Sequence, residues 1–319
     1  MTDWLSPLVE TRARRPEAVA ERAQARRRRP LLDESGQLLI VAADHGARAA
    51  LGSGAEPMAM ASRVELVDRL LVALSRPGVD GVLGTPDVLE DLLLLGALDG
   101  KVVLGSMNRG GLAGADFELD DRFTGYDAEA LAGMRFDGGK MLLRIDVTDP
   151  GSLATLESSA HAITGLARHR LMALVEPFWS RRQSGRVSHD LSPDAVIRAL
   201  AVASGLGVTS AYTWLKVPVV NEMERVMAAS TLPALLLGGE AVADRDATYR
   251  SWQQALALPT VRGLVVGRNL LYPPDDDVAA AVDAAAALLG RTPAAPAAAT
   301  PARAPAAGPA GAPAAEVPA

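Results

Sequence analysis

The 32 lysines and arginines of this chain include only three lysines, and these are its clearest candidates for amine chemistry. An arginine side chain cannot be deprotonated near neutral pH. A lysine in a desolvated, cation-rich pocket can be, and its free amine can then form a Schiff base with a carbonyl compound. Lys216 lies in the apolar run AYTWLKVP at residues 211–218, which is typical of a buried strand. A charged side chain is costly there, so Lys216 is the leading candidate nucleophile.

Other polar residues stand near the ends of apolar runs, where they could assist such an amine. Asp44 closes the run QLLIVAAD, and Glu176 lies near the end of LMALVEPF. Lys140 and Arg144 are four residues apart in KMLLRID, so the two-residue period of a strand places them on one face. Nearby cations would lower the pKa of Lys216, and Glu176 could move protons to and from the carbinolamine. A salt-bridged or structural lysine is the competing interpretation for each of the three, and it is favoured for Lys101, at the start of its strand.

Glycines at the ends of two later runs predict an anion site. Gly238 and Gly239 end the run ALLLGGE, and Gly267 and Arg268 stand in GLVVGRN. Backbone NH groups that follow the last two strands of an α/β barrel often hold a phosphate, although turns also use glycine. Asp44 and His45 together could suggest a metal pair, but four histidines and no cysteine in the whole chain make a metal site improbable. We therefore expect no metal and no cofactor.

The elements that must position these residues alternate regularly. Apolar runs without strict polar alternation are separated by segments with apolar residues at helical spacing, as expected for a parallel (β/α)8 barrel, also called a TIM barrel. A doubly wound open sheet is the alternative, but no GxGxxG sequence follows the first run. The eight candidate strands lie in residues 37–44, 79–84, 101–107, 140–146, 171–178, 211–218, 234–240 and 263–269.

The two ends of the chain differ from the middle. Residues 1–35 predict an N-terminal helical extension, whose basic run could bind acidic polymers but is better explained as a solvated helix because glutamates interleave. Residues 36–290 form the predicted barrel, and residues 291–319 are almost wholly Ala and Pro and predict a disordered tail. The net charge of -6 argues against a nucleic-acid partner. No apolar stretch predicts a membrane span or a signal peptide, so a cytoplasmic protein is expected, and apolar outer helices such as DVLEDLLLLGALDG predict a homo-oligomer.

Over residues 36–290 the chain resembles class I, Schiff-base aldolases. The branch is the one that contains tagatose-bisphosphate, sulfofructose-phosphate and bacterial or archaeal fructose-bisphosphate aldolases. The motifs that carry the resemblance are AADHG, FTGYD, GGKMLLRID, LVEPF, LKVP, LLGGE and VVGRN, in this order. The resemblance implies that Lys216 forms the Schiff base, Glu176 is the acid and base, Lys140 tunes the imine, Asp44 pairs with a hydroxyl or ammonium group, and the phosphate is bound by Gly238, Gly239, Gly267 and Arg268.

By the same resemblance, the chain is a metal-independent lyase that cleaves or forms a carbon-carbon bond in a phosphorylated ketose or keto-sugar acid and releases dihydroxyacetone phosphate. Arg144 replaces an aromatic residue expected in tagatose-bisphosphate aldolases, and with Arg181, Arg182 and Arg186 it points to a second anion on the substrate, as in inositol or sugar-acid catabolism. An exposed basic loop is the competing interpretation. The alternatives for function are a deoxyribose-phosphate aldolase, a transaldolase, a thiolase-like Schiff-base enzyme and a non-catalytic sugar-phosphate-binding barrel.

Overall fold

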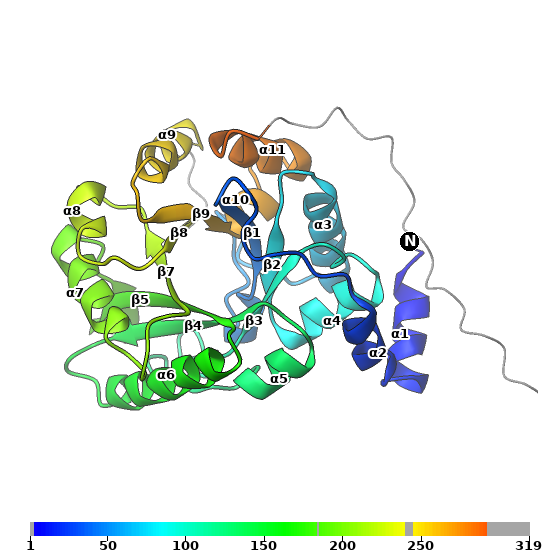
Figure 1. Cartoon of the computed structure of the whole chain (residues 1–319), viewed down its shortest axis with the longest axis horizontal. Coiled ribbons are helices and arrows are strands. Elements are labelled where there is room, and N and C mark those ends of the chain that lie inside the picture. The colour runs from blue at the N-terminus through cyan, green and yellow to red at the C-terminus, as the bar shows by residue number, and fades with distance from the viewer. Residues whose placement is uncertain (1–2, 184, 240–244, 292–319) are drawn as a thin grey trace, which may run out of the picture.

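The computed structural model describes residues 3–183, 185–239 and 245–291, which contain a closed barrel of parallel strands surrounded by helices (Figure 1). Pairing of β9 (Val261–Val266) with β1 (Leu38–Ala43), with Leu38 opposite Gly263, closes the ring. The predicted (β/α)8 barrel is confirmed, and the open sheet is wrong because an open sheet would leave these two strands unpaired. The strands in barrel order are β1 (Leu38–Ala43), β2 (Gly81–Gly84), β3 (Val102–Ser106), β4 (Gly138–Ile145), β5 (Met172–Gln183), β7 (Thr213–Pro218), β8 (Ala234–Leu237) and β9 (Val261–Val266).

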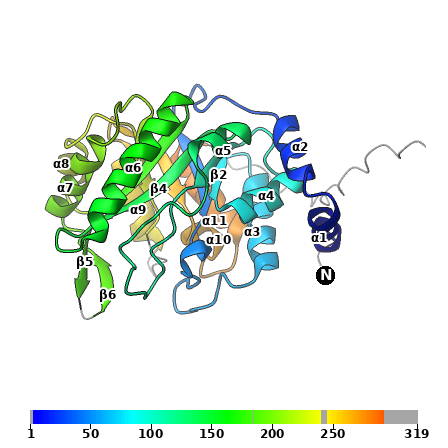
Figure 2. The same cartoon turned by 90° about the horizontal axis from the view of Figure 1, so that it is seen from below.

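One strand lies outside the barrel. β6 (Arg186–His189) pairs antiparallel with the end of β5, and this hairpin projects beyond the ring (Figure 2).

Among the described residues no helix is long and apolar enough to cross a membrane. The helices are α1 (Leu5–Arg14), α2 (Ala18–Ala25), η1 (Gly46–Arg48), α3 (Arg63–Ser75), α4 (Pro86–Leu94), α5 (Ala128–Gly133), α6 (Gly151–Arg168), α7 (Pro193–Ser204), α8 (Met223–Met227), α9 (Arg245–Leu256), α10 (Arg268–Leu271) and α11 (Val278–Leu288).

Alternation along each strand decides which side chains point into the barrel. Leu174 of β5 and Trp214 of β7 are register partners and belong to a small apolar cluster inside the ring. Their neighbours Val175 and Leu215 pack outward in the larger core between sheet and helices. The two-residue period therefore carries Glu176 and Lys216 inward, one layer nearer the C-terminal end of the barrel.

The basic run at residues 26–29 closes the opposite end of the barrel. The sequence predicted a solvated helix here, but α2 ends at Ala25 and Arg26 is only 3% exposed. The Arg28 guanidinium donates to Asp137 at 2.8 Å, and Arg26 also contacts Asp137. The same carboxylate accepts a hydrogen bond from the backbone NH of Val103 at 2.9 Å. The run is thus bound by carboxylates at the N-terminal ends of the strands.

Helices α1 and α2 lie against α4, beside the barrel (Figures 1 and 2). Trp4, Leu8 and Ala18 form an apolar cluster with Val67 of α3 and Leu94 of α4. The leucine-rich segment at residues 87–100, whose apolar surface predicts a homo-oligomer, is therefore covered in part by the chain's own N-terminal helices. Less apolar surface is then left for a contact between subunits. Of the tail predicted from residue 291 onward, only Arg291 lies among the described residues.

Candidate active site

A chain of ion pairs crosses the C-terminal end of the barrel and joins the four residues predicted to be catalytic. Lys216 Nζ lies 2.8 Å from Glu176 Oε1. The other oxygen of Glu176 contacts Lys140 Nζ, which in turn lies 3.2 Å from Asp44 Oδ2. These residues come from β7, β5, β4 and the end of β1, and all four are buried. The structure therefore brings the two amines and the two carboxylates into one alternating cluster.

Burial and charge together decide how these groups titrate. Burial lowers the pKa of Lys216, and Arg109 and Arg268 lower it further, whereas Glu176 opposes the shift. Burial alone would raise the pKa of Glu176, but the neighbouring cations, with Lys140 first, hold it well below its usual range. The cluster thus places a carboxylate that stays ionised beside an amine that loses its proton more readily than an ordinary lysine.

Arg109 is a member of this cluster that the sequence analysis missed. Its guanidinium pairs with Asp44 and donates through Nε to Ser106 Oγ at 3.2 Å, while Ser106 donates to Asp44 at 3.2 Å. Burial lowers the pKa of Arg109 to about 10. Ser106 and Arg109 stand at and just after the end of an apolar run, so the rule that singled out Asp44 and Glu176 would have found them.

Arg144 lies apart from the ion-pair chain although it shares an inward face with Lys140. Its guanidinium is fully buried and forms a bidentate pair with Asp121, at 2.8 Å from Nε and 2.6 Å from Nη2. It also contacts Glu118 at 3.4 Å and the carbonyl of Gly111 at 3.2 Å. These partners belong to the segment between β3 and α5. The Arg144 donors are therefore engaged by the protein itself and hold this segment over the barrel.

The residues predicted to bind phosphate lie after β8 and β9. Gly267 is buried against β1, because a Cβ there would lie 2.6 Å from the carbonyl oxygen of Ala42. Arg268 follows at the start of α10, and its buried Nε has no hydrogen-bond partner among the described residues. Asn269 donates to the carbonyl of Gly238 at 2.6 Å and ties the two segments together. Gly239 has a φ of +68°, a conformation that favours glycine.

The three arginines predicted to meet a second anion lie on or beside the β5–β6 hairpin. Arg182 is bound to the segment before α5, since it donates to the carbonyl of Asp116 at 2.8 Å, whereas Arg181 and Arg186 are exposed. At the base of the hairpin the rings of Phe178 and His189 stack with centroids 4.3 Å apart. The base of the hairpin thus contains a stacked pair of aromatic rings that the sequence analysis did not anticipate.

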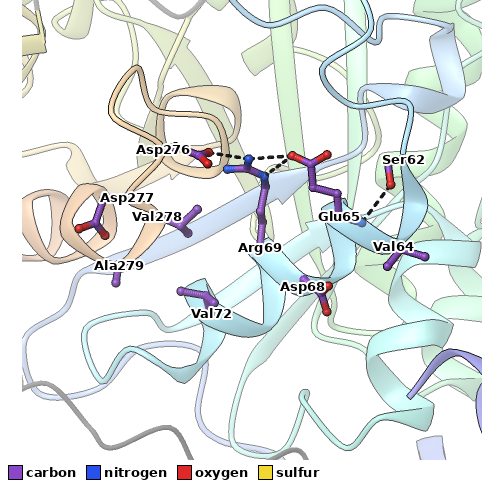
Figure 3. A pocket seen from close by; sticks show the side chains of 10 residues that line it. All are labelled: Ser62, Val64, Glu65, Asp68, Arg69, Val72, Asp276, Asp277, Val278 and Ala279. Carbon is purple, nitrogen blue, oxygen red and sulfur yellow. Dashed lines mark hydrogen bonds and ion pairs between the residues drawn. The ribbon is translucent and has the colours of Figure 1, made fainter. Parts of the chain in front are cut away.

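A separate depression on the outer surface, between α3 and the start of α11, has no such chemistry (Figure 3). Arg69 lies among its acidic residues and pairs with Glu65 at 2.7 Å and Asp276 at 2.6 Å.

Among the described residues, no group of three His, Asp or Glu side chains could hold a metal ion. The barrel end with Lys216 is therefore the candidate active site.

Comparisons with known proteins agree with this fold. Cgl0159 from Corynebacterium glutamicum is 56% identical, with a TM-score of 0.88 over 89% of this chain and 96% of that one. A Schiff-base-forming fructose-1,6-bisphosphate aldolase (TM-score 0.61) and an archaeal fructose-1,6-bisphosphate aldolase with its catalytic lysine bound to a carbinolamine intermediate (TM-score 0.62) are each 17% identical. Each comparison covers 85% of this chain and 99% of the aldolase, and each shows a shared barrel fold. No curated protein matches the chain. The model of the Cgl0159-like family matches residues 36–286, and the chain belongs to this family.

Proposed function

We propose that this protein is a class I aldolase that acts through a Schiff base on Lys216. The observation that carries the proposal is the contact between the Lys216 amine and the Glu176 carboxylate, 2.8 Å apart at the C-terminal end of the barrel. Catalytic groups of such barrels lie at this end. The similarity to Schiff-base-forming fructose-bisphosphate aldolases supports the same reaction class.

The residues suit each step of such a reaction. The nitrogen lone pair of Lys216 attacks the ketone carbon, the carbonyl oxygen gains a proton, and the carbinolamine loses water to give an iminium ion. A carboxylate accepts the proton of the hydroxyl on the β-carbon, the second carbon from the iminium carbon. The bond between the α- and β-carbons then breaks, the β-carbon leaves as an aldehyde, and the electron pair of the broken bond moves into the iminium to form an enamine. Protonation of the enamine carbon and hydrolysis then release the second product and restore the amine.

Glu176 would move these protons, and its contacts with both lysines support this role. Lys140 has two carboxylate partners, Asp44 and Glu176, which stabilise its ammonium form, whereas Lys216 pairs with Glu176 alone among the described residues. Burial and Arg109 nevertheless lower the pKa of Lys140 well below the ordinary lysine value, so the choice of Lys216 as the nucleophile rests on its slight exposure, 4% against 0% for Lys140, and on the similarity to Schiff-base-forming aldolases. Lys140 would then keep Glu176 oriented and ionised through the cycle.

The proposed substrate is a phosphorylated ketose or keto-sugar acid that yields dihydroxyacetone phosphate. Even with Lys216 deprotonated, Lys140, Arg109 and Arg268 outnumber the carboxylates Asp44 and Glu176, and this positive excess favours a phosphate. The tagatose-bisphosphate and sulfofructose-phosphate types belong to the proposed range, as do the sugar acids of inositol breakdown. A panel of donors and acceptors separates these from a deoxyribose-phosphate aldolase, a transaldolase or a thiolase-like reaction.

Reductive trapping tests the proposal. The protein incubated with dihydroxyacetone phosphate and borohydride should carry a reduced adduct on Lys216, located by peptide mass spectrometry. Lys216→Arg should abolish the adduct and lower turnover by roughly 1,000-fold or more. Lys101→Arg is the matched control, because Lys101 donates to the Val79 carbonyl at 2.6 Å at the other end of the barrel and should trap like the native protein. An unmodified Lys216 in a protein whose activity is lost on addition of EDTA would overturn the proposal.

A further inference from the structure

We propose that His45 binds the substrate by donating a hydrogen bond from its imidazole to the phosphate group held beside Lys216. The inference rests on the proposed function and adds a binding residue to that site. His45 follows Asp44 directly at the end of β1, so it stands next to the ion-pair chain.

The ring of His45 lies against the backbone that the phosphate would approach. Its Cε1 atom is 2.8 Å from the position that a Cβ on Gly267 would take. Gly267 precedes Arg268, the first residue of α10. Strands β1 and β9 are neighbours in the barrel, and their pairing brings these two segments together. The imidazole therefore lies beside the predicted phosphate site and within the electrostatic influence of Lys216.

Two buried nitrogen atoms of this corner have no hydrogen-bond partner among the described residues. His45 Nδ1 is buried and has no hydrogen bond within the described part of the chain, and the same holds for Nε of Arg268. Buried polar atoms are almost always paired, so two orphaned nitrogens on adjoining segments call for a missing partner. With the proton on Nδ1, a phosphate oxygen in this corner would be the acceptor that the buried Nδ1–H lacks. Nδ1–H of His45 and Nε–H of Arg268 are then the two donors that such a ligand would satisfy.

Burial and the nearby cations keep the His45 ring neutral. Burial lowers the pKa of His45 most, and Arg268 and Lys216 lower it further, to about 3. At neutral pH the ring therefore carries one proton and no charge. A neutral donor binds an anion without adding a further cation beside Lys216, where a charge would hinder protonation of the imine.

Kinetics with two donors test this role. In His45→Ala we expect the half-saturating concentration of dihydroxyacetone phosphate to rise roughly tenfold. The value for unphosphorylated dihydroxyacetone should stay unchanged, since that donor lacks the phosphate. His45→Gln keeps an N–H donor and should restore part of the affinity. His161→Ala, on the exposed face of α6, is the matched control and should change neither value.

A second measurement separates this inference from the proposed function. Calorimetric titration with inorganic phosphate should show binding to the native protein. The affinity for phosphate should be roughly tenfold lower in His45→Ala. If phosphate binding depends on His45 but no adduct forms on Lys216, the inference survives and the aldolase proposal fails. Equal losses for both donors, or an unchanged phosphate affinity in His45→Ala, would overturn the inference while an adduct on Lys216 would still support the aldolase.

Discussion

At the scale of single residues, the three lysines show how position decides chemistry. Lys101 donates to a backbone carbonyl at the N-terminal end of the barrel, at 2.6 Å. Lys140 is fully buried between two carboxylates, whereas Lys216 is 4% exposed and has one carboxylate partner among the described residues. The same side-chain type therefore serves as a structural donor, as a proposed electrostatic partner and as a proposed nucleophile.

Arg109→Gln should change the pH dependence of trapping. Arg109 is one of the cations that lower the pKa of Lys216, so its removal favours the protonated amine and raises that pKa. The rate of borohydride trapping rises with pH as the amine loses its proton, and we expect the midpoint of this rise to move to higher pH. Arg122→Gln is the control, since Arg122 is exposed and pairs with Asp120 at 2.9 Å. A midpoint that moves to lower pH, or does not move, would refute the role of Arg109.

At the scale of elements, close contacts between strand ends shape the predicted phosphate site. Gly267 lies against β1 at the end of β9, and the glycine provides the room for the Ala42 carbonyl and the His45 ring. The sequence predicted Gly267 as a phosphate ligand because it ends a strand. Its packing against β1 could not be predicted, because the approach depends on how the ring of strands closes.

Gly267→Ala should therefore weaken both the fold and the donor affinity. The added Cβ would lie 2.6 Å from a backbone oxygen and must displace β1 or α10, so we expect a loss of about 2 kcal/mol in the free energy of unfolding. The half-saturating concentration of dihydroxyacetone phosphate should rise as well. Gly133→Ala at the end of α5 is the control, since a Cβ there meets nothing within 4 Å. Denaturant unfolding of both variants measures the difference, and equal stabilities would contradict the packing argument.

At the scale of the whole molecule, the N-terminal segment binds the end of the barrel opposite the candidate site. Asp137 contacts Arg26 and Arg28 and accepts from the backbone of β3, so one carboxylate joins the extension to the strands. A buried pair with Arg26 and a partly exposed pair with Arg28 thus join the extension to the barrel. The cytoplasmic location and the homo-oligomer remain predictions, and sedimentation of the purified protein tests the latter.

Asp137→Ala should destabilise the protein substantially. It leaves the buried Arg26 without its carboxylate and the Val103 NH without its acceptor, and the loss of one partner from a buried pair typically costs about 3 kcal/mol. Asp99→Ala removes an exposed pair with Arg27 and should cost less than about 0.5 kcal/mol. Chemical denaturation provides both values, and a similar small effect for the two variants would show that the extension does not depend on this pair.

Local patterns in the sequence alone were enough to determine the barrel and to predict the polar residues near the ends of its strands. A strand has a period of two residues, so the apolar runs already place Lys216, Glu176, Lys140 and Asp44 near strand ends. The tertiary structure decided the partners of each charge, because ion pairs join residues far apart in the chain. Arg28 and Asp137, 109 residues apart, form such a pair, and Arg144 is engaged by Asp121. A sequence shows which charges exist, but only the closed barrel brings particular charges within a few ångströms of one another and buries them together.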